Sequence, residues 1–335
     1  MSYKYVNDLY YQKGRTSLMN ILRMRYFIDV AKFENITKAA QINYISQTAM
    51  SQQIANIEHE LEIKLFTRNK GHLHLTDAGY SFYKDCMHIL KDYDSAVRHA
   101  QNIWNHQFGQ GELYLGILGS STFSYLDDIL VSFNDKYPNI NVKLVQVSFA
   151  SMRNDLEQGN LDLAICPSFN FSGLANINCM DLYDDKMGFL VPITHPLARK
   201  DSVYISDIIH EKIIMTDAAW AGMAYEKMLD SRRQVGYEPI ISETAASAII
   251  HRTLVAFGRG CAFLPEHMGI YDNRKCKMLH IIDDPDVQTT SLAWQKNTNS
   301  PPLLYLVTLI QNFFRDEFKD WLEEYLEFQK ENEII

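Results

Sequence analysis

Apolar and polar positions near the N-terminus alternate with the period of short amphipathic helices. Within residues 21–33, Leu22, Tyr26, Phe27 and Val30 fall on one face of a helix. Such a stripe is typical of a surface helix that packs one side onto a small core. The segment is therefore predicted to form the first helix of an N-terminal domain.

Two further helices are predicted directly after it, separated by a short break. Asn35 or Thr37 can cap a helix that runs to about residue 42, because both side chains accept hydrogen bonds from backbone N–H groups. Ser46 can cap the next helix. The apolar positions of that helix are spaced by four, three and four residues at Met50, Ile54, Ile57 and Leu61. Two short helices around a tight turn indicate a helix-turn-helix.

A β-hairpin and a long helix are predicted to follow. Leu73 and Leu75 alternate with histidines after Gly71, which is typical of a small hairpin and would form a wing. Thr76 can cap a helix over about residues 77–105. Its apolar residues recur at steps near four and three, at positions 82, 86, 89, 90, 93, 97, 100 and 104. This stripe favours packing against a second copy over an ordinary core helix, since nothing nearby supplies a core for about eight turns.

Beyond this helix the pattern changes to alternating strands and helices. Phe108-Gly109-Gln110-Gly111 breaks the helix and marks a domain boundary. Short apolar runs are predicted as strands at residues 113–118, 142–147, 163–166, 186–191, 212–215, 261–264 and 291–295. Intervening helices are typical of parallel sheets of α/β type. Because about 225 residues would be large for one such sheet, two lobes are expected.

The distribution of charge separates the two parts of the chain. The 335 residues carry a net charge of −9, which is unusual for a protein that binds nucleic acid. Residues 1–75 carry ten basic and six acidic side chains, so the rest of the chain holds a net −13. Only the N-terminal part has a balance suited to phosphate.

The sequence gives no indication of export or membrane insertion. It lacks a run of about 18 apolar residues, and residues 1–20 hold four charged side chains without the apolar stretch of a signal peptide. Five scattered cysteines form no CxxC pair and are expected to be reduced thiols. We therefore expect a cytoplasmic protein with no membrane partner.

Several motifs, taken in order, resemble the LysR-type bacterial transcription regulators. The N-terminal motifs are Thr37–Ala40, Ser46–Ile54, Leu61-Glu62, Leu65–Arg68 and Leu75–Gly79. Later matches are Gly111–Gly116, Phe133, Tyr137-Pro138, Gly159–Ile165, His195–Leu197, Gly258–Gly260 and Leu264-Pro265. The resemblance implies an α+β multidomain chain: a winged helix-turn-helix over 19–76, a linker and dimerisation helix over 77–108, and a two-lobed α/β domain over 109–335 like that of periplasmic binding proteins. Lobe one would comprise about 109–187 and 290–335, lobe two about 188–289, and residues 1–18 an N-terminal extension.

Three positions depart from the family's pattern. Thr48 stands where the family usually has Pro, Asn43 where it usually has Leu, and Asp127 where Pro is common. Ile42 or Tyr44 could supply the apolar contact that Asn43 lacks. These departures leave the expected fold intact but make the operator sequence harder to infer.

Candidate DNA contacts follow from the helix pattern and the resemblance together. The polar face of the predicted recognition helix would meet base edges in the major groove and holds Gln47, Thr48, Ser51 and Gln52. Gln52 can form two hydrogen bonds with adenine, and Thr48 can contact a thymine methyl. The candidate phosphate contacts are Thr37, Lys38, Arg68 and Lys70. On spacing alone, the same face could equally be ordinary solvated surface.

A candidate effector site follows the first predicted strand of the C-terminal part. Ser120, Ser121 and Thr122 open a predicted helix, where hydroxyls and N–H groups can bind an anion, although simple capping would need only one of these residues. The resemblance implies that the effector cleft lies here and adds Cys166, Ser168, Trp220 and Ser247. We therefore expect a small effector with a carboxylate or comparable anionic group, and Trp220 or Phe263 as its apolar wall.

Other functions are less well supported by the sequence. A solute-binding protein would need an export signal, and an enzyme would need a Ser/His/Asp or Cys/His set, which does not stand out. Gly258-Arg259-Gly260 lacks the third glycine of a dinucleotide fingerprint, and His72-x-His74 lacks a third metal ligand. Asp184-Asp185 and Asp283-Asp284 are expected in surface turns. We expect no enzymatic activity, metal or cofactor.

The expected partners follow from this assignment. They are double-stranded DNA carrying an interrupted palindromic operator, a small-molecule effector, and further copies of the chain in a homodimer or homotetramer. RNA polymerase is a further candidate partner.

Overall fold

The structure, a computed structural model, describes residues 19–69, 72–118, 125–266, 268, 274–284 and 287–318. The chain divides into two units, residues 1–98 and 99–335, and the division falls inside the long helix α5 (Asp77–His106). A helix of residues 77–105 was predicted, and the observed one ends a single residue later. Within the described ranges, none of the helices combines the length and the apolar character that crossing a bilayer requires.

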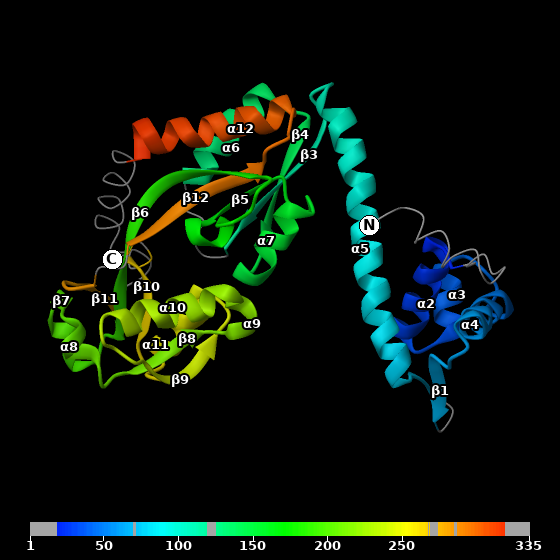
Figure 1. The fold of residues 1–335 in the computed structure, drawn as a ribbon, viewed down its shortest axis with the longest axis horizontal. Coiled ribbons are helices and arrows are strands. Elements are labelled where there is room, and N and C mark those ends of the chain that lie inside the picture. The colour runs from blue at the N-terminus through cyan, green and yellow to red at the C-terminus, as the bar shows by residue number, and fades with distance from the viewer. Residues whose placement is uncertain are drawn as a thin grey trace. The chain divides into compact units, whose positions relative to one another are not determined.

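The first unit is a helix-turn-helix with a β wing, as predicted (Figure 1). Its elements before α5 are α2 (Ile21–Phe33), α3 (Ile36–Ile42), α4 (Gln47–Leu61), β1 (Phe66–Asn69) and β2 (His72–Leu75). Side-chain caps determine where the short helices begin: Asn35 accepts from the Lys38 N–H, and Ser46 accepts from the Ala49 N–H at 3.1 Å. Of the two predicted caps for α3, Asn35 is the one used.

One apolar core holds these elements together. Phe27, Met50 and Ile57 are completely buried, and the Phe27 ring lies 5.1 Å from that of Phe82 on α5. Gly79 is required where α5 starts, because a Cβ there would lie 2.0 Å from the carbonyl oxygen of Leu65. The start of α5 therefore belongs to the core of the first unit, and Phe82, Cys86 and Leu90 pack into this core rather than facing outward.

The turn between α3 and α4 corrects one expectation. Ile42 is 49% exposed and Tyr44 97% exposed, so neither supplies the apolar contact expected in place of Asn43. Instead, Asn43 Nδ2 donates to Asp29 Oδ2 at 2.7 Å and to the Ala39 carbonyl at 2.9 Å. A polar anchor therefore holds the turn against α2 where the family usually has leucine.

The second unit is an α/β domain with two lobes (Figure 1). Lobe one has its strands in the order β4-β3-β5-β12-β6, with α6 (Tyr125–Lys136) and α12 (Pro301–Asn312) sharing one core and α7 (Phe149–Glu157) in another. The strands are β3 (Gly111–Ile117), β4 (Ile140–Gln146), β5 (Leu163–Pro167), β6 (Ile177–Pro192) and β12 (Val287–Gln295). The end of α5 is tied to this unit by His106, whose Nδ1 lies 2.8 Å from Ser300 Oγ.

Lobe two contains the remaining strands and has its own cores. Its elements include β7 (Ser202–Val203), α8 (Ile205–Ile208), β8 (Lys212–Thr216), α9 (Ala218–Ala221), α10 (Met223–Gln234), β9 (Ile240–Ala245), α11 (Ala248–Ala256), β10 (Ala262–Pro265) and β11 (Cys276–Ile281). Strand β6 runs through both lobes: it pairs with β12 as far as Lys186 and with β10 from Met187 onward.

The sheets differ from the sequence-based expectation in three respects. They are mixed rather than purely parallel, since β12 runs antiparallel to both β5 and β6. Strands β9 and β11 and the first half of β6 were not predicted. Asp184 and Asp185 lie inside β6 rather than in a turn, whereas Asp283 does lie in an exposed turn and only the side chain of Asp284 next to it is buried, at 2% exposed.

Candidate functional site

One face of α4 is buried and the other is open to solvent. Met50, Ile54 and Ile57 pack inward, spaced by four and three residues as the helix period requires. The opposite face exposes the four predicted base-contacting side chains, Gln47, Thr48, Ser51 and Gln52. Gln52 Nε2 donates to Asn56 Oδ1 at 2.8 Å, one turn along the same helix. The polar face is thus ordered on a rigid scaffold.

The predicted phosphate contacts flank this face. Thr37 and Lys38 are exposed in the first turn of α3, and Lys38 Nζ lies 4.7 Å from the centroid of the Phe33 ring. Arg68 is exposed on β1. Lys70 lies outside the described residues.

Glu58 fixes the wing relative to the recognition helix. Its Oε1 accepts from the backbone N–H groups of Leu65 and Phe66 at 2.9 and 3.0 Å, and Lys64 Nζ donates to Oε2 at 2.6 Å. Burial acts to raise the pKa of Glu58, but these hydrogen bonds outweigh it and lower the pKa below its usual value. The carboxylate therefore stays charged at neutral pH and holds β1 at a fixed distance from α4.

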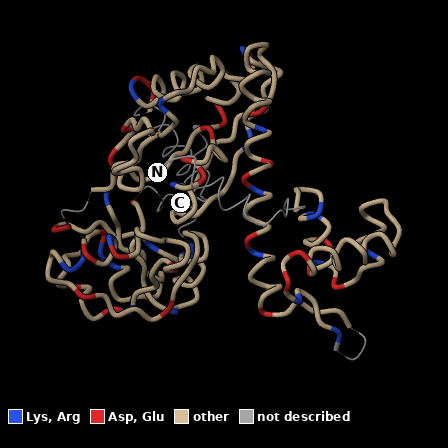
Figure 2. Tube along the Cα trace, turned by 45° about the vertical axis from the view of Figure 1, so that its right-hand side comes forward, with Lys and Arg blue, Asp and Glu red and all other residues tan. Residues whose placement is uncertain are grey.

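Helix α5 carries an exposed apolar stripe. Ile89, Tyr93 and Val97 follow one another at steps of four residues and are 44%, 45% and 39% exposed. Acidic and basic residues are interspersed along the helix (Figure 2), and Met87, Ile103 and Trp104 are further exposed apolar side chains on it. Since apolar side chains at this spacing form one face of a helix, Ile89, Tyr93 and Val97 make a continuous apolar surface.

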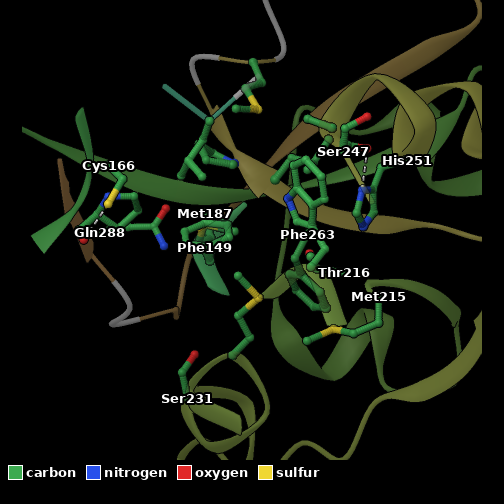
Figure 3. Close-up of a pocket in the computed structure, with 18 of the residues that line it drawn as sticks. Phe149, Cys166, Met187, Met215, Thr216, Ser231, Ser247, His251, Phe263 and Gln288 are labelled. Carbon is green, nitrogen blue, oxygen red and sulfur yellow. Dashed lines mark hydrogen bonds between the residues drawn. The ribbon is translucent and has the colours of Figure 1, made fainter. Parts of the chain in front are cut away.

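A cavity of about 150 Å³ lies between the two lobes. Lobe one contributes the ends of β5 and β12, with Cys166 and Gln288, and lobe two contributes Met215, Thr216 and Phe263 from the opposite side (Figure 3). Further apolar lining comes from Phe149, Met187, Trp220, Met228 and Met268. The cavity is therefore mostly apolar, with a few hydroxyl and amide groups.

The polar groups of the lining are largely held in place by the protein. His251 is 3% exposed, its Nδ1 lies 2.9 Å from the Ser247 carbonyl oxygen, and burial lowers its pKa, so the ring is neutral at pH 7 (Figure 3). The Ser247 hydroxyl caps α11 by accepting from the Ile250 N–H. Burial also raises the pKa of the Cys166 thiol, which makes it a poor nucleophile.

Arg232 is the one arginine among the described lining residues, and it is buried in an ion pair. Its side chain is 5% exposed and bonds to Asp284, whose side chain is 2% exposed. The guanidinium carbon also lies 4.7 Å from the centroid of the Phe263 ring. Because the charge of Asp284 is already matched by Arg232, this pair serves the packing of lobe two and the shape of the cavity wall.

The structure brings together four of the predicted effector residues. Cys166, Trp220, Ser247 and Phe263 all line the cavity, although they come from four separate segments. Ser168 does not line it. It lies on the 3-10 turn of Ser168–Phe171 beside a second hollow, together with Asn170 and Lys227.

The predicted anion-binding segment Ser120, Ser121 and Thr122 lies outside the described residues. Conversely, the sequence interpretation did not identify the methionines of the lining, or Thr216, His251, Gln288 and Arg232. The methionines have no polar group and no distinctive spacing in the sequence, so no sequence pattern could identify them as lining a ligand cavity.

Comparison with known proteins agrees with both units. Residues 21–80 match the family model described as "Bacterial regulatory helix-turn-helix protein, lysR family", and residues 106–315 match "LysR substrate binding domain". The Hca operon transcriptional activator HcaR of Escherichia coli (strain K12) is 24% identical over 293 residues, which cover 88% of this chain and 97% of HcaR. The transcriptional dual regulator GltC of Bacillus subtilis (strain 168) is 28% identical, covering 85% of this chain and 93% of GltC.

Solved structures share the same fold over nearly the whole chain. Full-length CbnR, crystallised in complex with its target DNA, has a TM-score of 0.68 at 19% identity and covers 88% of this chain and 99% of its own. Full-length BenM has a TM-score of 0.55 at 23% identity and covers 89% of this chain. The LysR substrate-binding model alone matches more than half of the chain. The chain therefore belongs to the LysR family of DNA-binding transcriptional regulators, which are not enzymes, and it joins their helix-turn-helix to an effector-binding domain.

Proposed function

We propose that this regulator reads its operator through the exposed face of α4 and positions itself through the residues beside it. The observation that carries the proposal is the division of α4 into a buried face at Met50 and Ile57 and an exposed polar face. In this arrangement Gln47, Thr48, Ser51 and Gln52 contact bases, while Thr37, Lys38, Arg68 and Lys70 contact phosphates. To reach a base, the Gln52 amide exchanges its hydrogen bond to Asn56 for one to the base edge.

Selection of genomic fragments by the full-length protein tests this proposal. Fragments retained at physiological salt should share an interrupted palindrome, because two copies of α4 must enter the major groove at a fixed spacing. Retention of unrelated sequences with equal strength would contradict base reading by α4.

We also propose that the effector occupies the cavity between the lobes. The lining supports a ligand with an apolar body, and a volume near 150 Å³ holds about one six-membered ring. The described lining adds neutral hydrogen-bonding groups at Thr216, Ser247 and Gln288. An anionic end of the effector is assigned to Ser120, Ser121 and Thr122, which follow the first strand of lobe one.

Three compounds with one ring and different charges separate the parts of this proposal. Benzoate, benzyl alcohol and benzylamine each present the same apolar body to the cavity. We expect benzoate to stabilise the full-length protein most, by about 2.7 kcal/mol at 100 times its dissociation constant, as measured by thermal unfolding. A larger shift with benzylamine would contradict the anionic assignment.

Matched variants locate the binding site in this experiment. Trp220→Ala should lose most of the shift, because Trp220 lines the cavity, whereas Phe257→Ala removes a ring that is 82% exposed elsewhere on lobe two and should keep it. Ser120→Ala combined with Thr122→Val should remove the preference for benzoate over benzyl alcohol. Equal shifts in all variants would place the ligand elsewhere.

The proposal also covers the roles of the domains, the assembly of the protein and its location in the cell. We assign residues 19–76 to DNA binding, 77–108 to the linker helix and 109–335 to effector binding. The exposed stripe of α5 supports a homodimer or homotetramer, in which closure of the cavity would alter how the DNA-binding units are spaced. Because a regulator of this kind acts on DNA, we expect the protein in the cytoplasm, where RNA polymerase is a further candidate partner.

A further inference from the structure

Three side chains with metal-binding atoms meet at one edge of lobe two, outside the effector cavity. The ligand atoms of His195, Glu211 and Cys261 all lie within 4.8 Å of one another, and His195 Nε2 is 3.3 Å from Glu211 Oε2. Each comes from a separate segment: His195 precedes the 3-10 turn of Pro196–Arg199, Glu211 precedes β8, and Cys261 precedes β10. No local pattern in the sequence indicates this group, because its members are 16 and 50 residues apart along the chain.

The backbone holds these three positions in place, and for His195 the backbone N–H donates to the Pro192 carbonyl at 2.9 Å. The Cys261 N–H donates to the Lys212 carbonyl at 2.8 Å, and the Cys261 carbonyl accepts from the Ile214 N–H at 2.8 Å. The Glu211 N–H donates to the Ile208 carbonyl at 3.0 Å. A site whose ligands are set by backbone hydrogen bonds on adjacent strands is preorganised, which is what tight coordination requires.

A buried hydroxyl next to this group lacks a partner. Tyr237 is 2% exposed, and its phenol oxygen has no hydrogen bond to any described residue. Tyr237 and Cys261 belong to the same buried core of lobe two, and burial raises the pKa of Tyr237 to about 12. An unsatisfied buried hydroxyl lowers the stability of the fold, and a water bound beside it would relieve that cost.

We propose that His195, Glu211 and Cys261 bind a Zn²⁺ ion. An imidazole nitrogen, a carboxylate oxygen and a thiolate are the donor set that Zn²⁺ accepts, and three protein ligands leave its fourth position for a water beside Tyr237. Binding releases the Cys261 thiol proton. The His195 proton moves from Nε2 to Nδ1, and the long 3.3 Å hydrogen bond from the Leu197 N–H is given up.

The position of the site suggests what the ion does. Glu211 and Cys261 precede the first residues of β8 and β10, which run parallel, and the last residues of the same strands, Thr216 and Pro265, line the effector cavity. An ion would therefore tie together the ends of two strands whose other ends contact the effector. If no ion binds here, the assignment of the effector cavity is unaffected, because none of the three proposed ligands lines that cavity.

Titration of the full-length protein with Co²⁺, a spectroscopic substitute for Zn²⁺, tests this proposal. We expect one equivalent to give a thiolate-to-cobalt charge-transfer band, and one equivalent of Zn²⁺ to remove it. Cys261→Ser should abolish the band. His195→Gln and Glu211→Gln should each weaken Zn²⁺ binding by at least the roughly 10- to 100-fold attributed to outer ligands.

Two matched controls make the result specific. Cys179→Ser removes the exposed cysteine, and His210→Gln removes an exposed histidine next to Glu211, and both should bind as the unaltered protein does. If Cys261→Ser fails to fold, the two glutamine variants decide, since their side chains are 21% and 30% exposed. Absence of the band, or its loss in Cys179→Ser with survival in Cys261→Ser, would overturn the proposal.

Discussion

Replacement of Arg232 by alanine should destabilise lobe two by about 3–5 kcal/mol. The variant breaks the ion pair between Arg232 and the Asp284 carboxylate, which is 2% exposed, and removing one member of a buried ion pair is far more costly than the pair itself is stabilising. It also removes the cation beside the Phe263 ring in the wall of the effector cavity. The midpoint of urea unfolding, followed together with the slope of the transition, measures the loss.

Arg233 provides the matched control, one residue along the same helix. Its side chain is 44% exposed and pairs with Glu238 and Asp230 at the surface, where ion pairs contribute little, so Arg233→Ala should change the stability far less than Arg232→Ala does. An Arg232→Met, Asp284→Leu double variant should recover most of the stability, because it replaces a buried pair by apolar side chains. Equal effects of Arg232→Ala and Arg233→Ala would show that the buried pair does not stabilise lobe two.

The second large effect is expected on assembly. An Ile89→Asp, Val97→Asp double variant places two charges on the apolar stripe of α5 and should shift the protein toward the monomer in light scattering. Because a dimer holds two DNA-binding units on one operator, its loss should weaken operator binding by about 10²- to 10⁴-fold.

A control on the same helix isolates the stripe. Lys84→Gln and Lys91→Gln change the net charge by the same amount but fall on the opposite side of α5, given about 100° of rotation per residue. This second double variant should keep the oligomeric mass of the unaltered protein. A stripe variant that also keeps it would exclude this part of α5 as a principal contact.

The first unit could be predicted from its sequence because its determinants are local. Asn35 and Ser46 cap helices that begin one residue later, and the buried positions of α4 follow the helix period within a single segment. The wing was equally visible, since Leu73 and Leu75 alternate with histidines in the sequence and the strand that they form pairs with the neighbouring segment Phe66–Asn69. Short-range hydrogen bonding and periodicity therefore sufficed for the fold of this unit.

Strand β6 shows why the second unit was harder to predict. Its acidic residues gave the segment around Asp184 the pattern of a surface turn. In the structure, Asp181 accepts from Ser291 Oγ and Asp184 accepts from Thr289 Oγ1, both at 2.7 Å across the sheet. These partners lie more than 100 residues away, so no local pattern could reveal that the acids are satisfied within a strand.

The lining of the effector cavity was hard to predict for the same reason. Cys166, Trp220 and Ser247 were identified through the family resemblance, whereas Met215 and Gln288 became visible only when the lobes were assembled. Each lobe supplies a few side chains to a shared space, and the chain crosses between lobes at β6 and β12. Such a site is a property of the packing rather than of any one segment.

The most direct test of the central claim, that α4 reads the operator, compares two variants on the selected operator. Gln52→Ala should relax base preference and cost about 1–3 kcal/mol on the best site, because it removes a base contact. Arg68→Ala should weaken all sequences alike and flatten the dependence of affinity on salt, because it removes a phosphate contact. Binding of randomised operators by full-length protein over a series of salt concentrations measures both. If Arg68→Ala changes base preference while Gln52→Ala leaves it unchanged, α4 is not the element that reads the DNA.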